Sequence, residues 1–127
     1  MVDFAVETKK PHILVADDEV IAVLALERLL SRKGYRVTTA GDGRKALAAH
    51  ESDPADVLVT DIRMPRGGGR ELIDALRTRD ARLPIVVMTG YMSLSDEEAM
   101  PSGDRLVVMQ KPIDVERLLR LIREFLG

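Results

Sequence analysis

Short apolar runs alternate along this chain with longer amphipathic stretches. Five such runs occur, at 12–16, 35–40, 55–60, 84–89 and 106–110. Runs of this length, rich in Val, Ile and Leu, are typical of strands that are buried on both faces. Helical spacing of apolar residues predicts helices over 20–33, 44–51, 71–79 and 115–126. Strands that alternate with helices predict an α/β fold, a doubly wound, five-stranded parallel sheet with helices on both faces.

The composition fits one globular domain. The chain has 127 residues, of which 46% are hydrophobic and 31% charged, and it has no cysteine for a disulfide or a thiolate metal site. A net charge of -2 gives no basic footprint for nucleic acid. No apolar run approaches the roughly 18 residues of a membrane span, and the N-terminus lacks a signal-peptide core. We therefore expect a tail over 1–10, a folded domain over 11–127, a cytoplasmic location, and no direct binding to nucleic acid or membrane.

Polar residues follow most of the predicted strands. The residues that follow these strands are Asp17, Asp18 and Glu19; Asp61; Thr89 and Gly90; and Lys111 and Pro112, of which all but Gly90 and Pro112 are polar. Ligands of parallel α/β sheets bind beyond the carboxyl ends of the strands, so these side chains are expected to share one crevice. Clustered carboxylates raise one another's pKa unless a cation neutralises them, and a site of oxygen ligands suits Mg²⁺. A carboxylate can also act as a nucleophile and form an aspartyl phosphate, whose oxygens a lysine ammonium and a threonine hydroxyl can bind.

Each of these residues also has a purely structural explanation. The acids at 17–19 can complement a helix dipole, and Asp61 can belong to the turn before a Pro-Gly loop. Thr89 can be an ordinary strand residue, and Lys111 can be a solvated strand end. The presence of all of them at the correct strand ends favours a functional site. By contrast, His12 and His50 have no ligand spacing and are interpreted as bystanders.

The sequence around the strand ends resembles the response-regulator receiver domain, of the stand-alone, chemotaxis-receiver-like type. The resemblance covers residues 12–126. The motifs that carry it are ILVADDE at 13–19, VLVTDIRMP at 57–65, VVMT at 86–89 and the Lys111–Pro112 pair. It implies a flavodoxin-like sheet with the strand order 2-1-3-4-5. It also makes Lys111–Pro112 a candidate cis peptide bond.

The resemblance implies two-component signal transduction. Asp61 would accept a phosphoryl group from a histidine kinase or a histidine phosphotransfer protein. Mg²⁺ would be held by Asp17, Asp18, Asp61 and the backbone carbonyl of Arg63, and Thr89 and Lys111 would complete the catalytic set. Such a protein is no conventional enzyme, because it catalyses only its own phosphotransfer and dephosphorylation. It would act by switching the binding of an unidentified downstream protein or by relaying phosphate. Nothing follows Gly127, so no effector domain is expected, unless the chain is a fragment of a larger protein.

The chain departs from the family at positions that normally carry the signal from the phosphorylation site to the surface. Val108 stands where the family carries a switch aromatic, three residues before the lysine. Pro101 cuts short a helix whose capping-box signal begins at Ser95. The usual threonine–aromatic relay therefore cannot operate through Val108, and Tyr91 is a candidate substitute. In the family, the positions of Arg63 and Tyr91 tune how fast the phosphoryl group is lost.

The first predicted helix offers a docking surface. The residues expected to face the core are Ala22, Ala25, Leu26, Leu29 and Leu30. Val20, Val23 and Leu24 are expected to point away from the core, beside the acidic crevice. Exposed apolar groups next to a site suggest docking, here by the helical bundle that carries the donor histidine. The alternative is that they are tolerated surface aliphatics.

Two other functions stay open. A phosphatase of the haloacid dehalogenase type also uses an Asp nucleophile and Mg²⁺. That family needs a second acid two residues after the nucleophile, where this chain has Arg63, and a cap domain does not fit in 127 residues. The other is a degenerate receiver that acts as a binding module without phosphorylation. The complete set of acids, Thr89 and Lys111 argues against it, whereas Val108 and Pro101 favour it.

Overall fold

The computed structural model describes residues 10–90 and 105–127. Its elements are β1 (His12–Ala16), α1 (Val20–Arg32), β2 (Arg36–Ala40), α2 (Gly43–Ser52), β3 (Val57–Asp61), α3 (Gly69–Arg79), β4 (Ile85–Thr89), β5 (Leu106–Gln110) and α5 (Val115–Leu126). All strand pairs are parallel, and the sheet order is β2-β1-β3-β4-β5. The predicted α/β fold and the predicted strand order are therefore confirmed.

Some predictions lie outside the described residues. They concern the tail, of which only Lys10 is described, and the segment with Tyr91, Ser95 and Pro101. The Lys111–Pro112 peptide bond is cis, as predicted. None of the helices in residues 10–90 and 105–127 combines the length and the apolar character needed to cross a bilayer.

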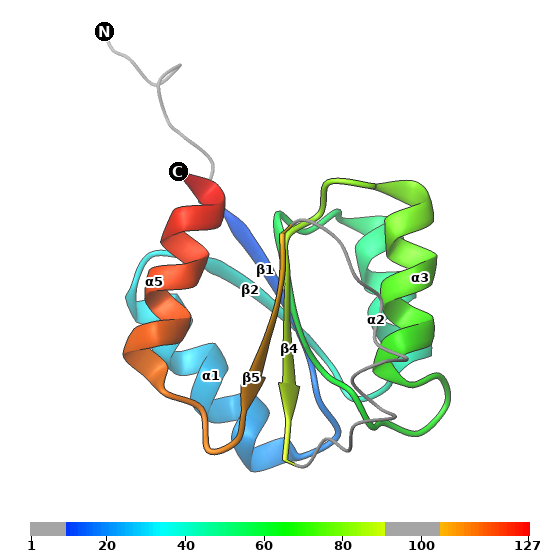
Figure 1. Ribbon diagram of the computed structural model, residues 1–127, viewed down its shortest axis with the longest axis horizontal. Coiled ribbons are helices and arrows are strands. Elements are labelled where there is room, and N and C mark those ends of the chain that lie inside the picture. The colour runs from blue at the N-terminus through cyan, green and yellow to red at the C-terminus, as the bar shows by residue number, and fades with distance from the viewer. Residues whose placement is uncertain (1–9, 91–104) are drawn as a thin grey trace, which may run out of the picture.

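The sheet separates two layers of apolar side chains. Figure 1 shows it edge-on, with α1 and α5 on one face and α2 and α3 on the other. Successive strand residues point to opposite faces, so β1 contributes Ile13 and Val15 to one core and Leu14 and Ala16 to the other. Burying a side chain of leucine size stabilises the fold by roughly 1.5–3 kcal/mol, so both faces of each central strand contribute. The strand ends are thereby held in fixed register.

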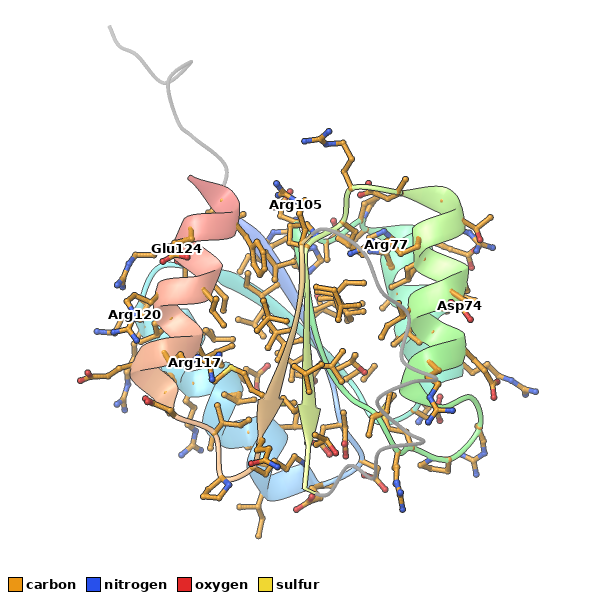
Figure 2. The ribbon with its side chains drawn as sticks, viewed as in Figure 1. Asp74, Arg77, Arg105, Arg117, Arg120 and Glu124 are labelled. Atoms are coloured by element: carbon orange, nitrogen blue, oxygen red, sulfur yellow. The ribbon has the colours of Figure 1, made fainter. Side chains whose placement is uncertain are left out.

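Helix α5 is strongly amphipathic. Leu118, Leu119 and Ile122 are buried, whereas Arg117, Arg120 and Glu124, which are labelled in Figure 2, are exposed. Val115, in the first turn, is 37% exposed.

An arginine ties the end of α5 to the start of β5. The Arg105 guanidinium donates to the Phe125 carbonyl oxygen at 3.0 Å and lies 5.8 Å from the centre of the Phe125 ring. Both contacts place a cation where the helix dipole and the ring face are negative. They fix the sheet edge against the helix that follows Lys111.

The buried face of α1 differs from the prediction. Leu26 and Leu30 are buried as expected, but Val23 is also buried and Ala25 is exposed. Val23, Leu26 and Leu30 are spaced three and four residues apart, which defines the stripe that faces the sheet. The predicted exposure of Val23 and burial of Ala25 are therefore wrong. The most exposed large apolar side chain on this helix is instead Ile21.

A glycine ends α1. Gly34 has a φ of 95°, its N–H donates to the Ser31 carbonyl, and the N–H of Tyr35 donates to the Leu30 carbonyl. This is a left-handed helix cap, which a glycine adopts without strain.

A buried histidine makes the stability of the fold depend on pH. His50 is buried in α2, and its Nδ1 accepts the Ala55 N–H at 3.0 Å. Burial lowers the pKa of His50, although the charge of Asp80 opposes this shift. Below the usual histidine pKa of about 6.5, the unfolded chain binds a proton that the folded chain does not. The contribution of His50 is therefore complete at neutral pH and is lost as the pH falls through that range.

We expect the free energy of unfolding in urea to fall between pH 7.5 and pH 5.5. The fall should be smaller in His50→Asn, because the variant has no imidazole to titrate. Equal pH dependence in the two proteins would assign the effect to other groups.

Candidate functional site: an acidic pocket at the strand ends

Four strand ends contribute to one edge of the sheet, the lower edge in Figure 1. Asp17 follows β1, Asp61 closes β3, Thr89 closes β4 and Lys111 follows β5. Three of these side chains are buried, because Asp17, Asp61 and Thr89 are only 2%, 8% and 1% exposed. Burial of polar groups at a strand end requires local partners. Those partners are largely the groups of the same pocket.

The ammonium group of Lys111 links three carboxylates. Its Nζ lies 3.1 Å from Asp17 Oδ2, 3.1 Å from Glu19 Oε1 and 3.4 Å from Asp61 Oδ2. Burial disfavours the ammonium, but hydrogen bonds to Asp17 and Glu19 and the nearby charge of Asp61 outweigh it and raise the pKa of Lys111. Lys111 is therefore a permanent cation in this pocket at neutral pH.

The carboxylate of Asp61 has two distinct oxygens. Oδ1 accepts the Ile62 N–H at 2.8 Å, whereas Oδ2 faces the Lys111 ammonium. Burial is the largest influence on the group and raises the pKa of Asp61. The charge of Asp17 adds to this, and Lys111 and the N–H groups of Arg63 and Ile62 oppose it. Negative charge on Asp61 is therefore costly, and a further cation would relieve it.

Three carboxylates are close enough to hold a metal ion. One oxygen each from Asp17, Glu19 and Asp61 lies within 4.8 Å of the others. Carboxylate oxygens without nitrogen or sulfur ligands suit a hard cation such as Mg²⁺. The predicted ligand Asp18 is exposed and does not belong to this group.

Glu19 does belong to the group, although the sequence did not assign it as a ligand. A local turn explains its place, because Asp17 Oδ1 accepts the Glu19 N–H at 3.0 Å. An Asp two residues before Glu was the signal for such a turn.

The remaining predicted residues border the same cavity. A pocket of about 260 Å³ is lined by Glu19, Asp61, Ile62, Arg63, Thr89, Gly90 and Lys111. The Lys111 N–H donates to the Thr89 carbonyl oxygen at 2.7 Å, which fixes these two strand ends relative to each other. Thr89 and Lys111 thus line the same cavity as Asp61, and this cavity is large enough for a small anionic group.

Comparison with known proteins gives one consistent family. Residues 13–123 match the family described as the response regulator receiver domain. Response regulator MprA of Mycolicibacterium vanbaalenii is 40% identical over 115 residues, which cover 91% of this chain and 50% of MprA. This chain therefore spans half the length of that relative.

Solved structures agree in fold. A response regulator receiver protein from Sinorhizobium medicae is 31% identical, with a TM-score of 0.83 over 93% of this chain and 95% of that chain. Chemotaxis protein CheY4 of Vibrio cholerae is 28% identical, with a TM-score of 0.83 over 92% of this chain and 99% of that chain.

Proposed function

This chain belongs to the response regulator receiver domain family of two-component signalling, and we propose that Asp61 is its phosphoacceptor. The observation that carries the proposal is the contact between Asp61 Oδ2 and the Lys111 ammonium, in a pocket that Thr89 also lines. A nucleophilic carboxylate beside a lysine and a hydroxyl has what phosphoryl transfer requires. The donor we propose is a phosphohistidine of a histidine kinase or of a histidine phosphotransfer protein.

The chemistry follows from the positions of the side chains. A lone pair of the Asp61 carboxylate attacks phosphorus, the new O–P bond forms, and the N–P bond to the donor imidazole breaks. The Lys111 ammonium, already 3.4 Å from Asp61 Oδ2, can move to a phosphoryl oxygen, and the Thr89 hydroxyl can donate to another. The Ile62 N–H holds Asp61 Oδ1, so the carboxylate does not rotate freely. Orientation of this kind supplies much of the rate of phosphoryl transfer.

The residues of the pocket fit Mg²⁺. We propose that Asp17, Asp18, Asp61 and the Arg63 carbonyl hold it, directly or through water, and that Glu19 belongs to the same site. When bound, the cation would neutralise charge on the transferring phosphoryl group. Asp17 and Asp61 are both buried and both lie beside the Lys111 ammonium, so a divalent cation would balance the remaining negative charge of the pocket.

Incubation with Mg²⁺ and acetyl phosphate, followed by intact-mass measurement, tests the proposal. We expect the mass to rise by one phosphoryl group, and to stay unchanged when a chelator removes the metal. An unchanged mass together with no Mg²⁺ binding would instead support a degenerate receiver that serves as a binding module.

The donor protein is proposed to dock on α1. Val20, Ile21 and Leu24 are 71%, 83% and 44% exposed and form an apolar surface at the start of this helix. Beside it lies a cavity of about 210 Å³, bordered by Glu19 and Lys111 of the acidic pocket. An apolar surface that adjoins the reacting group fits a helical bundle that carries the donor histidine. Val23, which the sequence placed on this surface, is buried and takes no part.

Ile21→Glu should slow phosphotransfer from a phosphohistidine donor domain by at least about tenfold, because a charge would be buried in the interface. Labelling by acetyl phosphate should not change. Ala48→Glu, an exposed site on α2 across the sheet, is the matched control. Equal loss with both phosphodonors would mean that Ile21 supports the pocket and not the docking.

We propose that phosphorylation, in the cytoplasm, changes the binding of a downstream protein or passes the phosphoryl group onward. The net charge of -2 gives no reason to propose direct contact with nucleic acid.

A further inference from the structure

The loop that follows Asp61, residues 62–68, is anchored to the start of α3. The Gly69 N–H donates to the Ile62 carbonyl oxygen at 3.0 Å. A Cβ atom on Gly69 would lie 2.4 Å from the Asp61 carbonyl oxygen, closer than real Cβ atoms approach an oxygen. The two ends of the loop therefore lie next to each other, because Gly69 packs directly against the backbone of Asp61 and Ile62. We call this contact the first anchor.

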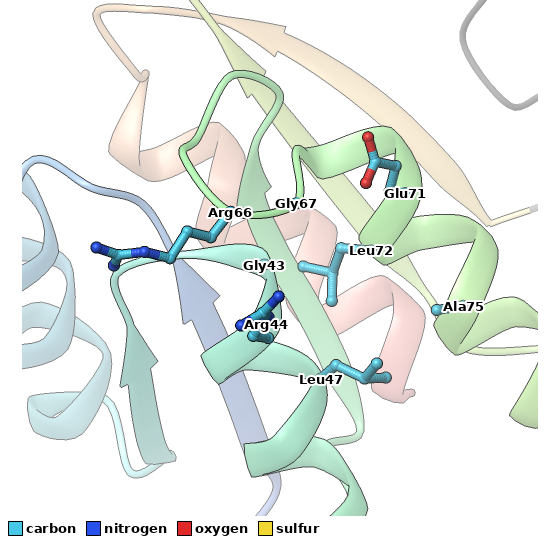
Figure 3. Close-up of a pocket in the computed structure, with 8 residues that line it drawn as sticks. All are labelled: Gly43, Arg44, Leu47, Arg66, Gly67, Glu71, Leu72 and Ala75. Carbon is cyan, nitrogen blue, oxygen red and sulfur yellow. The ribbon is translucent and has the colours of Figure 1, made fainter.

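A second anchor holds the far side of the loop against α2. A Cβ atom on Gly43 would lie 2.1 Å from the Gly67 carbonyl oxygen, so only glycine permits this approach. The Arg44 N–H donates to the Arg66 carbonyl oxygen at 3.2 Å. Figure 3 shows Gly67 beside Gly43, with the Arg66 side chain extended over the segment that leads into α2.

Asp42 joins helix and loop through one carboxylate. Its Oδ1 accepts the Lys45 N–H at 2.8 Å and caps α2, and its Oδ2 lies 3.4 Å from the Arg66 guanidinium. Asp42 is 3% exposed, whereas Arg66 is largely exposed. Arg66 and Gly67 have φ values of 50° and 94°, so the chain turns sharply where Asp42 and Gly43 hold it.

We propose that Asp42, Gly43 and Gly67, which we call the loop latch, position the 62–68 loop for Mg²⁺ binding at Asp61. The latch residues do not line the acidic pocket, but Arg63, between the two anchors, does. With both ends of the loop fixed, the Arg63 carbonyl keeps its place relative to the Asp61 carboxylate. Groups that orient the ligands of a metal typically change its affinity without touching it. The inference rests on the proposed phosphoacceptor function and adds positioning residues to the same site.

The loop has room to shift when the latch is altered. A cavity of about 400 Å³ lies between α2 and α3, lined by Gly43 and Gly67 at one end and by Leu47, Leu72 and Ala75 among others (Figure 3). A displaced loop therefore does not have to disrupt the packed cores. A change in metal affinity can be measured on a folded protein.

Gly43→Ala tests the latch, with Gly41→Ala as the matched control. Alanine at 43 would collide with the Gly67 carbonyl, whereas nothing lies within 4 Å of a Cβ at Gly41. We expect the Mg²⁺ dissociation constant, measured by titration calorimetry, to rise about tenfold in Gly43→Ala and to stay unchanged in Gly41→Ala. Labelling by acetyl phosphate should slow at low Mg²⁺ and recover at saturating Mg²⁺.

A second pair of variants keeps the test decisive if Gly43→Ala fails to fold. Asp42→Asn keeps an oxygen to cap α2 but loses the charge that attracts Arg66, so Mg²⁺ affinity should again fall. Glu51→Gln breaks the 3.0 Å ion pair between Glu51 and Arg79, which joins the same two helices away from the loop, and should leave affinity unchanged. Wild-type Mg²⁺ affinity in Asp42→Asn and in any folded Gly43→Ala would overturn the latch. A wild-type chain that neither binds Mg²⁺ nor is labelled would overturn the phosphoacceptor proposal itself.

Discussion

Asp61→Asn should abolish labelling by acetyl phosphate completely. The asparagine keeps the shape of the side chain and an oxygen for the Ile62 N–H, but it lacks the nucleophilic carboxylate. Intact-mass measurement with Mg²⁺ present should show only unmodified protein. Asp74→Asn removes an exposed carboxylate on the outer face of α3 and should be labelled as the wild type is (Figure 2). Persistent labelling of Asp61→Asn at the wild-type rate would place the acceptor elsewhere.

The same variant should fold more stably. Burial raises the pKa of Asp61 and Asp17 adds to the shift, so the ionised carboxylate costs folding free energy at neutral pH. Without Mg²⁺, removal of the charge should raise the free energy of unfolding in urea by roughly 0.5–2 kcal/mol. A gain in stability beside a total loss of labelling would separate the chemical role of Asp61 from any structural one.

Lys111→Met should slow labelling by about a hundredfold, the usual cost of removing one donor to a charged transition state. Methionine fills much of the same volume but cannot pair with a phosphoryl oxygen. The carboxylates that Lys111 now contacts, Asp17, Glu19 and Asp61, would then repel one another. Stability in a chelator should therefore fall, and Mg²⁺ should restore more of it than it adds to the wild type.

Lys33→Met, at an exposed position at the end of α1, is the control for Lys111→Met and should behave as the wild type does. Titration calorimetry should show that Lys111→Met still binds Mg²⁺. If Mg²⁺ binding disappears together with labelling, Lys111 holds the pocket together and has no separate role in the transfer.

The sequence predicted the fold well because buried parallel strands have a simple pattern. Their apolar runs are continuous, so Asp17, Thr89 and Lys111 could be assigned to strand ends without any contact information. The buried face of α1 could not be predicted in the same way. Every residue from Val20 to Leu26 is apolar, so the helical period of 3.6 residues does not single out one face of the helix.

The sequence could predict the site residues that lie at the ends of strands, but not those whose position depends on loops and turns. Glu19 lies beyond β1, and its place depends on the turn that Asp17 Oδ1 makes with its N–H. The approach of Gly43 to Gly67 joins the start of α2 to a loop that is distant in the sequence, and no local pattern predicts such a contact. Side-chain exposure, as for Asp18, likewise depends on the assembled pocket.

The contacts of Lys111 affect the stability of the fold when Mg²⁺ is absent. Three clustered acids would ordinarily demand a bound cation before the chain could fold, but the lysine is a built-in counter-ion for them. It is tethered to the chain, so dilution and chelation cannot remove it. The fold is therefore expected to persist when Mg²⁺ is absent. Mg²⁺ would then be needed for the proposed phosphorylation of Asp61 and not for folding.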